Sequence, residues 1–211
     1  MDDNKKFGEV NSEDIERVKK AAPDDLREKP PIDVKDEVFE WIESFVFAMF
    51  VVILIFTFLF RIVLVQGQSM CDTLQNGDRL IISHINYTPS KGDIVVINSS
   101  KLNKTIIKRV IGTAGDTVRV NYDNNTVTVN GKVISNENIK EPMYNTGYFS
   151  DEYLVESSVY EYNVPDGSIF VMGDNRNNST DGRSIGFVST DDVLGKAIFR
   201  LFPFNSIGKV K

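Results

Sequence analysis

The amino-acid sequence predicts a mostly β domain of antiparallel strands that follows a single N-terminal transmembrane helix. Two observations carry this prediction. An apolar run of 21 residues, from Phe45 to Val65, contains one charge, Arg61. After this run the chain changes to short segments rich in Val, Ile, Thr and Tyr, separated by Gly, Asn, Asp and Pro, which is typical of strands and turns. A chain of 211 residues has room for one such domain together with an anchor and a tail.

Residues 1–36 predict a disordered acidic tail, which we place in the cytoplasm. They carry many charges of both signs, three prolines and few large apolar side chains. Such a composition cannot bury enough surface to offset the entropy of ordering the chain. Within the tail, the segment SEDIERVKKAA can form a short amphipathic helix with Ser12 as its N-cap.

Residues 37–65 predict a transmembrane helix whose first turns lie in the interface. At about 1.5 Å per residue, the apolar run is roughly 31 Å long, which matches the hydrocarbon core of a bilayer. Trp41 precedes the run at the position of an interfacial aromatic residue. A cleaved secretory signal is the alternative, but the region before the run is long and acidic, and VLVQGQ lacks a small-x-small cleavage site. The sequence therefore favours an uncleaved single-pass anchor.

The charges that flank this helix indicate its orientation. Arg27, Lys29 and Lys35 precede the apolar run, whereas Arg79 alone follows it within twenty residues. Because positive flanks stay on the cytoplasmic side, we expect a cytoplasmic N-terminus and an extracytoplasmic domain.

Residues 66–211 predict the β domain. Asn130-Gly131, between TVTV and KVIS, is a strong signal for a hairpin turn. We expect an insertion or cap at about 117–165, because residues 136–162 are polar, contain tyrosines and show no clear period. The expected strands are RLIISHI, DIVVIN, TIIKRVIG, TVRVNY, TVTVNG, KVISN, SIFVMG and GKAIFRLF.

Composition excludes several functional classes. The net charge of -6 and the pI near 4.9 argue against nucleic acid as a partner, because binding it needs cations that neutralise phosphates. Cys71 is the only cysteine, so we expect no disulfide and no thiol cluster for a metal. The chain has neither HExxH nor a phosphate-cradling Gly-rich loop, and we expect no metal or other cofactor. Cys71 could act as a nucleophile only with the sole histidine, His84, as its base, and a small buried side chain is the favoured role.

A serine and a lysine are the candidate reacting groups. Ser69 follows directly on the apolar run, and Gly67 permits a tight backbone approach beside it. Lys108 lies 39 positions later in TIIKRVIG, next to Arg109. An arginine stays charged in proteins, whereas a lysine buried among aliphatic groups has a lowered pKa and can act as a base. The alternation of a strand does not decide which cation is buried, and an edge strand with both exposed is the alternative.

The third candidate segment, GDNRNNSTDGRSIG from Gly173 to Gly186, is unusually dense in polar groups. Such density predicts a buried polar network in which each donor finds an acceptor, and a solvated charged turn is the alternative. Its two aspartates and two arginines can pair with each other or with Arg109, and its Ser179 can donate to Lys108. The network members are Asp174, Arg176, Asp181, Arg183 and Arg109.

SM-x-x-TL with GD following, KRVIG-x-x-GD, and GDNR-x-x-S-x-D-x-R occur in this order, and together they resemble the boxes of bacterial type I signal peptidases. These membrane-bound Ser-Lys serine proteases remove signal peptides from exported proteins. The resemblance covers the chain from about Trp41 to its end and implies the family's antiparallel β fold.

By resemblance, Ser69 is the acylating nucleophile, Lys108 the general base and Ser179 the residue that orients the lysine amine. The resemblance assigns Met70 to substrate binding, and the network around Asp174 to holding the loops together, with Arg176 in support. The implied partners are the lipid bilayer and signal peptides, which are cut after a small-x-small motif, usually Ala-x-Ala. No metal or nucleic acid is implied.

Three positions depart from the usual boxes. Asp72 replaces a proline near Ser69, and Gly182 replaces a common serine. Gly67 stands where some members have a serine that completes the oxyanion hole, so we expect the Ser69 backbone N–H to serve with a second donor unassigned. A glycan on Asn177 or Asn178 would obstruct the loop, which favours a bacterial origin.

Two other functions fit parts of the sequence. A membrane-anchored, non-catalytic binding or assembly factor on this scaffold is favoured only by Asp72. A Ser-Lys autoprotease of the repressor-cleaving type shares the chemistry but lacks a membrane anchor.

Overall fold

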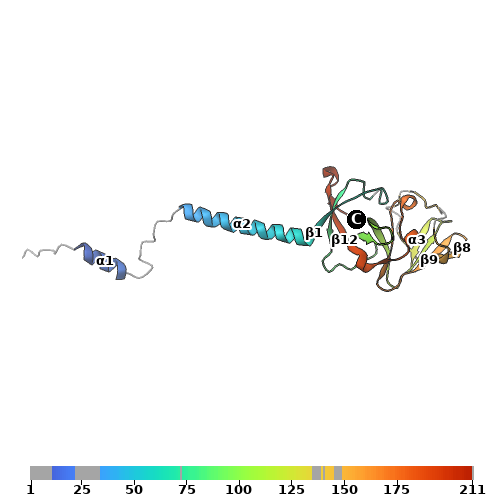
Figure 1. The fold of residues 1–211 in the computed structure, drawn as a ribbon, viewed down its shortest axis with the longest axis horizontal. Helices are drawn as coiled ribbons and strands as arrows, with labels where there is room; N and C mark the ends of the chain where they lie inside the picture. Colours follow the sequence, from blue (N-terminus) through green and yellow to red (C-terminus); the bar gives the residue numbers. More distant parts are fainter. Residues whose placement is uncertain are drawn as a thin grey trace, which may run out of the picture. The chain divides into compact units, whose positions relative to one another are not determined.

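The protein is described by a computed structural model over residues 11–21, 34–71, 73–134, 139, 141–144 and 149–210 (Figure 1). The chain divides into two units, Met1–Val52 and Ile53–Lys211, and each is described by itself. Most of the tail that we expected to be disordered, residues 1–10 and 22–33, lies outside the described residues, as does Asp72.

The N-terminal unit contains α1 (Ser12–Ala21) and most of α2 (Val34–Leu59). α1 begins at Ser12 itself, so Asn11 rather than Ser12 precedes the helix and accepts from the Asp14 backbone N–H at 3.0 Å. In α2 the stretch Glu37–Ile55 is long and apolar enough to cross a membrane. Its apolar side chains from Phe45 to Ile55 are exposed, as expected of a helix that contacts lipid, whereas its first turns carry Glu37, Glu40 and Glu43.

The helix ends earlier than the sequence predicted. α2 stops at Leu59, and the last residues of the apolar run form β1 (Phe60–Leu64), which pairs antiparallel with β2 (Arg79–Ser83). β1 is rich in β-branched and aromatic residues, and Val63 and Val65 pack against the core of the domain. A continuous apolar run does not distinguish a helix from a buried strand, so the sequence did not show that the helix ends at Leu59 and a strand begins at Phe60.

The larger sheet contains the strand with Lys108 and the strand that precedes the loop of Gly173 to Gly186, and every pairing in it is antiparallel. Its order is β1-β2-β12-β3-β4-β10-β11, with β13 paired to β12. β3 is buried on both faces, since Ile94 and Val96 pack in one core cluster while Val95 and Ile97 pack in another. The further members are β3 (Ile94–Ser99), β4 (Lys104–Thr113), β10 (Ser168–Met172), β11 (Val188–Ser189), β12 (Val193–Phe202) and β13 (Gly208–Lys209).

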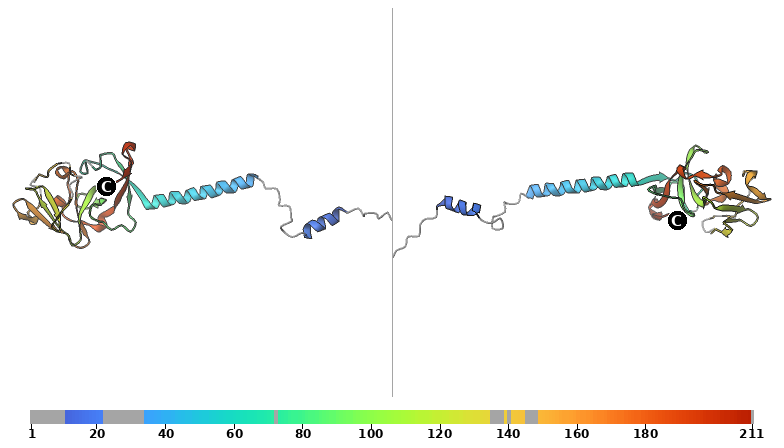
Figure 2. Two further views of the ribbon diagram at one scale, coloured as in Figure 1. Left: turned by 180° about the vertical axis from the view of Figure 1, so that it is seen from behind. Right: turned by 90° about the horizontal axis from the view of Figure 1, so that it is seen from below.

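A second sheet, in the order β7-β6-β5-β9-β8, is built from the chain between Thr117 and Asn163. Asn130 and Gly131 both have positive φ and form the turn between β6 and β7, which confirms the hairpin. In two views β8 and β9 lie at the opposite end of the domain from β1 (Figures 1 and 2). The strands are β5 (Thr117–Asn121), β6 (Thr126–Val129), β7 (Lys132–Val133), β8 (Leu154–Glu156) and β9 (Val159–Asn163).

An aromatic core joins the two sheets. Tyr162 of β9 packs against Phe170 of β10 with ring centroids 4.4 Å apart, and Tyr122 lies in the same buried cluster. The mostly antiparallel β class is therefore confirmed. Short helices complete the fold: α3 (Gly182–Ile185), η2 (Asp151–Tyr153), η3 (Arg176–Asn178), η4 (Thr190–Asp192) and η5 (Phe204–Ser206).

Candidate active site

Ser69 lies in the loop that connects β1 to β2. Backbone hydrogen bonds close the base of this loop, since the Val65 N–H donates to the Asp78 carbonyl at 2.8 Å. Gly67 has a φ of 92°, and its N–H donates to the Asn76 side chain at 2.9 Å. A left-handed conformation at this point suits glycine and turns the chain so that Ser69 is half-buried at the wall of a cleft.

Lys108 lies in the middle of β4 and reaches Ser69. Its side chain is only 3% exposed and shares a strand face with the buried Ile106 and Val110. The Lys108 Nζ donates to the Ser69 Oγ at 2.7 Å and to the Ile107 carbonyl at 3.0 Å. Burial penalises the charged amine and lowers the pKa of Lys108 from 10.5 to about 8. The structure thus brings together the two residues that the sequence singled out.

Arg109 is buried as well, but its charge is matched. Its Nε and Nη2 donate to the two oxygens of Asp174, each at 2.8 Å, and its Nη1 donates to the Gly92 carbonyl at 2.8 Å. Thr73, four residues after the nucleophile candidate, donates to the Asp174 Oδ2 at 2.5 Å. The Arg109–Asp174 pair therefore links β4, the loop after β10 and the Ser69 loop.

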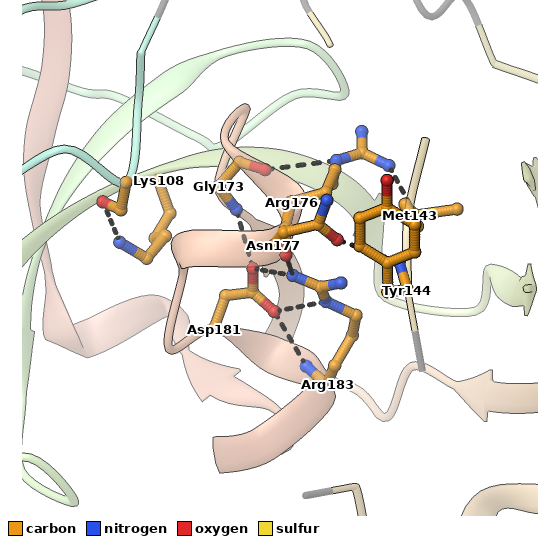
Figure 3. Close-up of polar contacts among 9 residues, drawn as sticks. Lys108, Met143, Tyr144, Gly173, Arg176, Asn177, Asp181 and Arg183 are labelled. Carbon is orange, nitrogen blue, oxygen red and sulfur yellow. Dashed lines mark hydrogen bonds and ion pairs between the residues drawn. The ribbon is translucent and has the colours of Figure 1, made fainter. Parts of the chain in front are cut away.

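Asp181 and Arg183 form a second buried ion pair. The Arg183 Nε and Nη2 donate to the two Asp181 oxygens, each at 2.9 Å, and the Gly173 N–H donates to Asp181 Oδ2 at 2.9 Å (Figure 3). The guanidinium also lies 5.3 Å from the centroid of the Phe149 ring, in a cation–π contact. This pair fixes the shape of the loop from within.

Arg176 does not join either pair. Its side chain is 4% exposed, and its Nε donates to the Gly173 carbonyl at 3.1 Å while Nη1 contacts the Met143 sulfur at 3.6 Å. Figure 3 shows its guanidinium directed away from Lys108, toward Met143. Burial lowers the pKa of Arg176 to about 10. The sequence predicted a pairing with an aspartate of the loop, and the structure places both aspartates on other arginines.

Ser179 lines the same cleft as Lys108 without touching it. Its Oγ is buried and forms no hydrogen bond with the Lys108 amine, so the expected contact is not formed; the hydroxyl lies close to the Asp181 carboxylate instead. Its neighbour in space is Gly173, where an added Cβ would lie 2.3 Å from the Ser179 Oγ and 2.5 Å from the Ser69 carbonyl oxygen. The backbone approach at Gly173 therefore needs glycine for lack of space.

Asn175 holds the backbone of the nucleophile candidate and was missed by sequence reasoning. Its backbone N–H donates to the Ser69 carbonyl at 3.0 Å, and its side-chain amide donates to the Gln68 carbonyl at 3.1 Å. Its position in the polar loop beside Asp174 was the one indication in the sequence, but Asn177 and Asn178 lie in the same loop, so position alone did not distinguish it.

Three other candidates lie away from the reacting atoms. Met70 was assigned to substrate binding, but its side chain is 2% exposed and belongs to the hydrophobic core, outside the lining of the cleft. Cys71 is buried and contacts Gln75 at 3.5 Å, whereas His84 is exposed at the end of β2. Cys71 and His84 share no hydrogen bond.

A cleft of about 1280 Å³ contains both Ser69 and Lys108. One part of its lining is apolar, with residues of β1 and β4, and the other is polar, with residues of the loop after β10. All ionisable side chains among its described lining are cations. The lining comprises Ile62, Val63, Leu64, Gln66, Gly67, Gln68, Ser69, Lys104, Thr105, Ile106, Ile107, Lys108, Phe149, Arg176, Asn177, Asn178, Ser179, Thr180, Ser184 and Leu194.

Within the described ranges, no cluster of three or more His, Cys, Asp or Glu side chains is arranged so that it could hold a metal ion. The reacting groups that the structure does assemble are an alcohol, a buried amine and backbone N–H groups, which suit acyl transfer.

The chain is similar to known proteins over most of its length. Residues 38–202 match the family model described as signal peptidase, peptidase S26. A signal peptidase I of Bacillus licheniformis is 37% identical over 191 residues, covering 87% of this chain and 99% of the relative. A signal peptidase IB of Staphylococcus aureus (strain COL) is 35% identical over 181 residues, covering 82% and 93%.

A crystal structure of a signal peptidase I from Enterococcus faecalis V583 aligns with 52% of this chain and 97% of its own, at 31% identity and a TM-score of 0.41. The family match and the two relatives establish kinship by sequence, in agreement with the resemblance of the three boxes. This chain belongs to the signal peptidase family, peptidase S26, and is a serine endopeptidase of that family.

Proposed function

We propose that this protein is a membrane-bound endopeptidase that cleaves signal peptides from exported preproteins after a small-x-small motif, usually Ala-x-Ala. The reaction proceeds through an acyl-enzyme on Ser69, with Lys108 as the general base. One observation carries this proposal: the Lys108 amine, buried and easily deprotonated, lies 2.7 Å from the Ser69 hydroxyl at the wall of a cleft. A weak nucleophile beside a neutral amine is the arrangement that Ser-Lys catalysis requires.

The steps follow from these positions. The neutral Lys108 Nζ takes the proton of Ser69 as its Oγ attacks the scissile carbonyl carbon, which forms a tetrahedral oxyanion. The intermediate then collapses, the C–N bond breaks, and Lys108 returns the proton to the departing amine of the mature protein. Water, deprotonated by the same lysine, then attacks the ester and releases the signal peptide with a free carboxyl group.

Two further groups take supporting roles in the proposal. The Ser69 backbone N–H donates to no acceptor within the described residues, so it is available to the oxyanion. The buried Ser179 hydroxyl lines the same cleft, so we assign it to holding the Lys108 amine when substrate is bound.

The substrate binds as an extended strand in this proposal. β1 is the terminal strand of its sheet, so one of its edges is unpaired, and it contributes Ile62, Val63 and Leu64 to the cleft. A peptide added to that edge would gain main-chain hydrogen bonds and present alternate side chains to shallow apolar pockets formed with Ile106 and Leu194. Shallow apolar pockets select small side chains, in agreement with a small-x-small motif.

Helix α2 is the proposed single-pass anchor, and the lipid bilayer is the proposed partner of its exposed apolar surface. The flanking charges Arg27, Lys29 and Lys35 support a cytoplasmic N-terminus and an extracytoplasmic catalytic domain. Exported preproteins emerge on that side of the membrane, so this orientation places the enzyme with its substrates.

The test uses full-length protein in detergent. The protein is incubated with a synthetic peptide that spans a signal-peptide cleavage site, and the products are mapped by mass. We expect one cut after Ala-x-Ala with the wild-type protein and none with Ser69→Ala. Equal cleavage by Ser69→Ala would refute the assigned nucleophile.

The same assay addresses the non-catalytic binding or assembly factor. Such a factor would bind the peptide without cutting it. No feature of the site favours this function, because the hydroxyl and the amine are both present and in contact.

A further inference from the structure

The loop after β10 has two aspartates, and each of them is paired with an arginine other than Arg176. Asp174 is occupied by Arg109, with two hydrogen bonds at 2.8 Å, and Asp181 is occupied by Arg183, with two at 2.9 Å. Arg176 is therefore left without a carboxylate at ion-pair distance among the described residues.

The contacts of Arg176 do not satisfy its guanidinium. The group has five N–H donors, and its partners among the described residues are one backbone carbonyl, of Gly173, and the sulfur of Met143, which is a weak acceptor. At 4% exposure it also has little water around it. A buried cation without a counter-charge is costly, and its lowered pKa reflects the same penalty. An anionic group of a bound substrate would supply the counter-charge that this guanidinium lacks.

Arg176 is a lining residue of the substrate cleft. Arg176 lines the cleft together with Ser69 and Lys108, and the ionisable groups among the described lining are Lys104, Lys108 and Arg176. This cationic lining occurs in a chain whose net charge is -6, so it is a local feature of the cleft. An anionic group of the substrate would meet attraction there and no carboxylate repulsion.

The two parts of the cleft indicate which part of the substrate meets Arg176. The apolar side chains of the lining, Ile62, Val63 and Leu64 of β1 with Ile106 and Ile107 of β4, suit the signal-peptide side of the scissile bond. Arg176 lies in the polar part with Asn177, Asn178 and Thr180, and its guanidinium is directed away from Lys108 (Figure 3). The polar part is therefore left for the residues that follow the bond.

We propose that Arg176 forms a subsite for the carboxylate of an Asp or Glu side chain within the first few residues of the mature protein. This subsite rests on the proposed function, because it assumes a peptide that runs through the cleft past Ser69. The planar guanidinium can bind such a carboxylate with two parallel hydrogen bonds, which selects it over a neutral amide.

The experiment compares matched peptides on the full-length enzyme in detergent. Each peptide carries the same signal segment and a single Glu or Gln at one of the first four mature positions. Glu and Gln have nearly the same shape, so their comparison isolates charge. At one position we expect kcat/KM to be about five- to twentyfold higher for Glu, mainly through KM, as for a charge-assisted hydrogen bond. Equal rates at all four positions would overturn the subsite.

Variants then assign the preference to Arg176. Arg176→Met should bring the Glu/Gln ratio of kcat/KM close to one, and Arg176→Lys should retain part of it. Lys104→Met is the matched control, because it removes one exposed cation from the same cleft and should lower the ratio much less than Arg176→Met does. A ratio that survives Arg176→Met, or that disappears in Lys104→Met, would overturn the assignment. The ratio is insensitive to partial unfolding, which lowers both rates equally.

The outcomes separate the subsite from the proposed function. If Ser69→Ala cleaves as well as the wild type, the proposed function fails and the subsite fails with it. If cleavage depends on Ser69 but shows no Glu preference, only the subsite fails. Should Arg176→Met not fold, the four-position scan of the wild-type enzyme still decides the question.

Discussion

At the scale of single residues, the burial of Lys108 determines the pH range of the proposed chemistry. The pKa of its amine is lowered to about 8, and only the neutral amine can accept the Ser69 proton. We therefore expect kcat/KM to rise about tenfold per pH unit below pH 8 and to level off above it. Rates measured between pH 6 and pH 10 test this, and a profile that is flat through pH 8 would contradict it.

The same burial predicts a gain in stability when the amine is removed. A folded pKa of about 8 against 10.5 means that the charged lysine destabilises the fold fully below pH 8, and that the cost disappears as pH rises toward 10.5. Lys108→Met should therefore abolish cleavage and raise the free energy of unfolding at pH 7 by up to about 3 kcal/mol. Denaturant unfolding at pH 7 and pH 10 tests the sign, and a less stable variant at pH 7 would refute the account.

Asn175 is predicted to act by positioning the nucleophile. Without its amide, the Gln68 carbonyl loses its 3.1 Å hydrogen bond and the Ser69 loop gains freedom. We expect Asn175→Ala to lower kcat by about 10- to 100-fold with a small change in KM, because a misplaced nucleophile slows the chemical step. Asn121→Ala is the control, since it removes side-chain hydrogen bonds to the backbone N–H groups of Asp123 and Asn124, at a turn of the second sheet. A change in KM alone would contradict the positioning role.

Sequence reasoning singled out Ser69 and Lys108, which the structure brings into contact, but not the pattern of contacts around them. A lysine can be a base and an arginine cannot, so chemistry alone distinguished Lys108 from Arg109. The hydrogen-bond partner of each side chain depends on how loops that are distant in sequence come together. For this reason the sequence did not predict that Arg176 lacks a carboxylate partner, or that Asn175 binds the carbonyls of Gln68 and Ser69. Residue type limits what a group can do, and only the backbone path decides which acceptor it meets.

At the scale of elements, the boundary between α2 and β1 shows where local patterns fail. The run from Phe45 to Val65 is uniformly apolar, yet its last part is a strand because β2 supplies hydrogen-bonding partners there. Eight strands were predicted from short runs rich in Val, Ile, Thr and Tyr and are present, whereas β8 and β9 were missed because their segment is polar and shows no clear period. In β9, Tyr160 and Tyr162 are nevertheless buried on one face.

Asp116 is the polar junction between the two sheets. It accepts hydrogen bonds from Lys91, Asn130 and Thr113, at 2.7 to 3.0 Å. Burial alone would raise the pKa of Asp116, but the hydrogen bonds from Thr113, Lys91 and Asn130 outweigh it and lower the value to about 2.

Removing this junction should weaken the fold. We expect Asp116→Ala to lower the free energy of unfolding by roughly 2–4 kcal/mol, since several charge-assisted bonds are lost. Because the folded pKa is depressed, the contribution is present above about pH 4 and is lost as pH falls toward 2. Denaturant unfolding at pH 7 tests the loss, with the exposed Asp123→Ala as control; equal stability of the two variants would show that Asp116 is not a junction.

At the scale of the whole molecule, the single cysteine makes the proposed membrane orientation testable. Cys71 is buried, so the wild-type protein should react little with a thiol reagent, whereas cysteines introduced at the exposed Ser12 and Lys132 should be accessible. In intact cells, a membrane-impermeant maleimide should label Lys132→Cys and leave Ser12→Cys unlabelled until the cells are opened. Labelling of Ser12→Cys from outside would reverse the orientation.

The order of strands in the larger sheet determines when, during synthesis, the Ser69 hydroxyl and the Lys108 amine can come into contact. β12, which includes Arg200, lies between β2 and β3, so it joins the hairpin that leads to the nucleophile with the hairpin that carries the base. Arg200 also donates to the Thr73 carbonyl in the nucleophile loop, at 2.7 Å. A ribosome must therefore finish almost the entire polypeptide before the alcohol and the amine can meet. The activity proposed for this pair therefore cannot begin until translation is nearly complete.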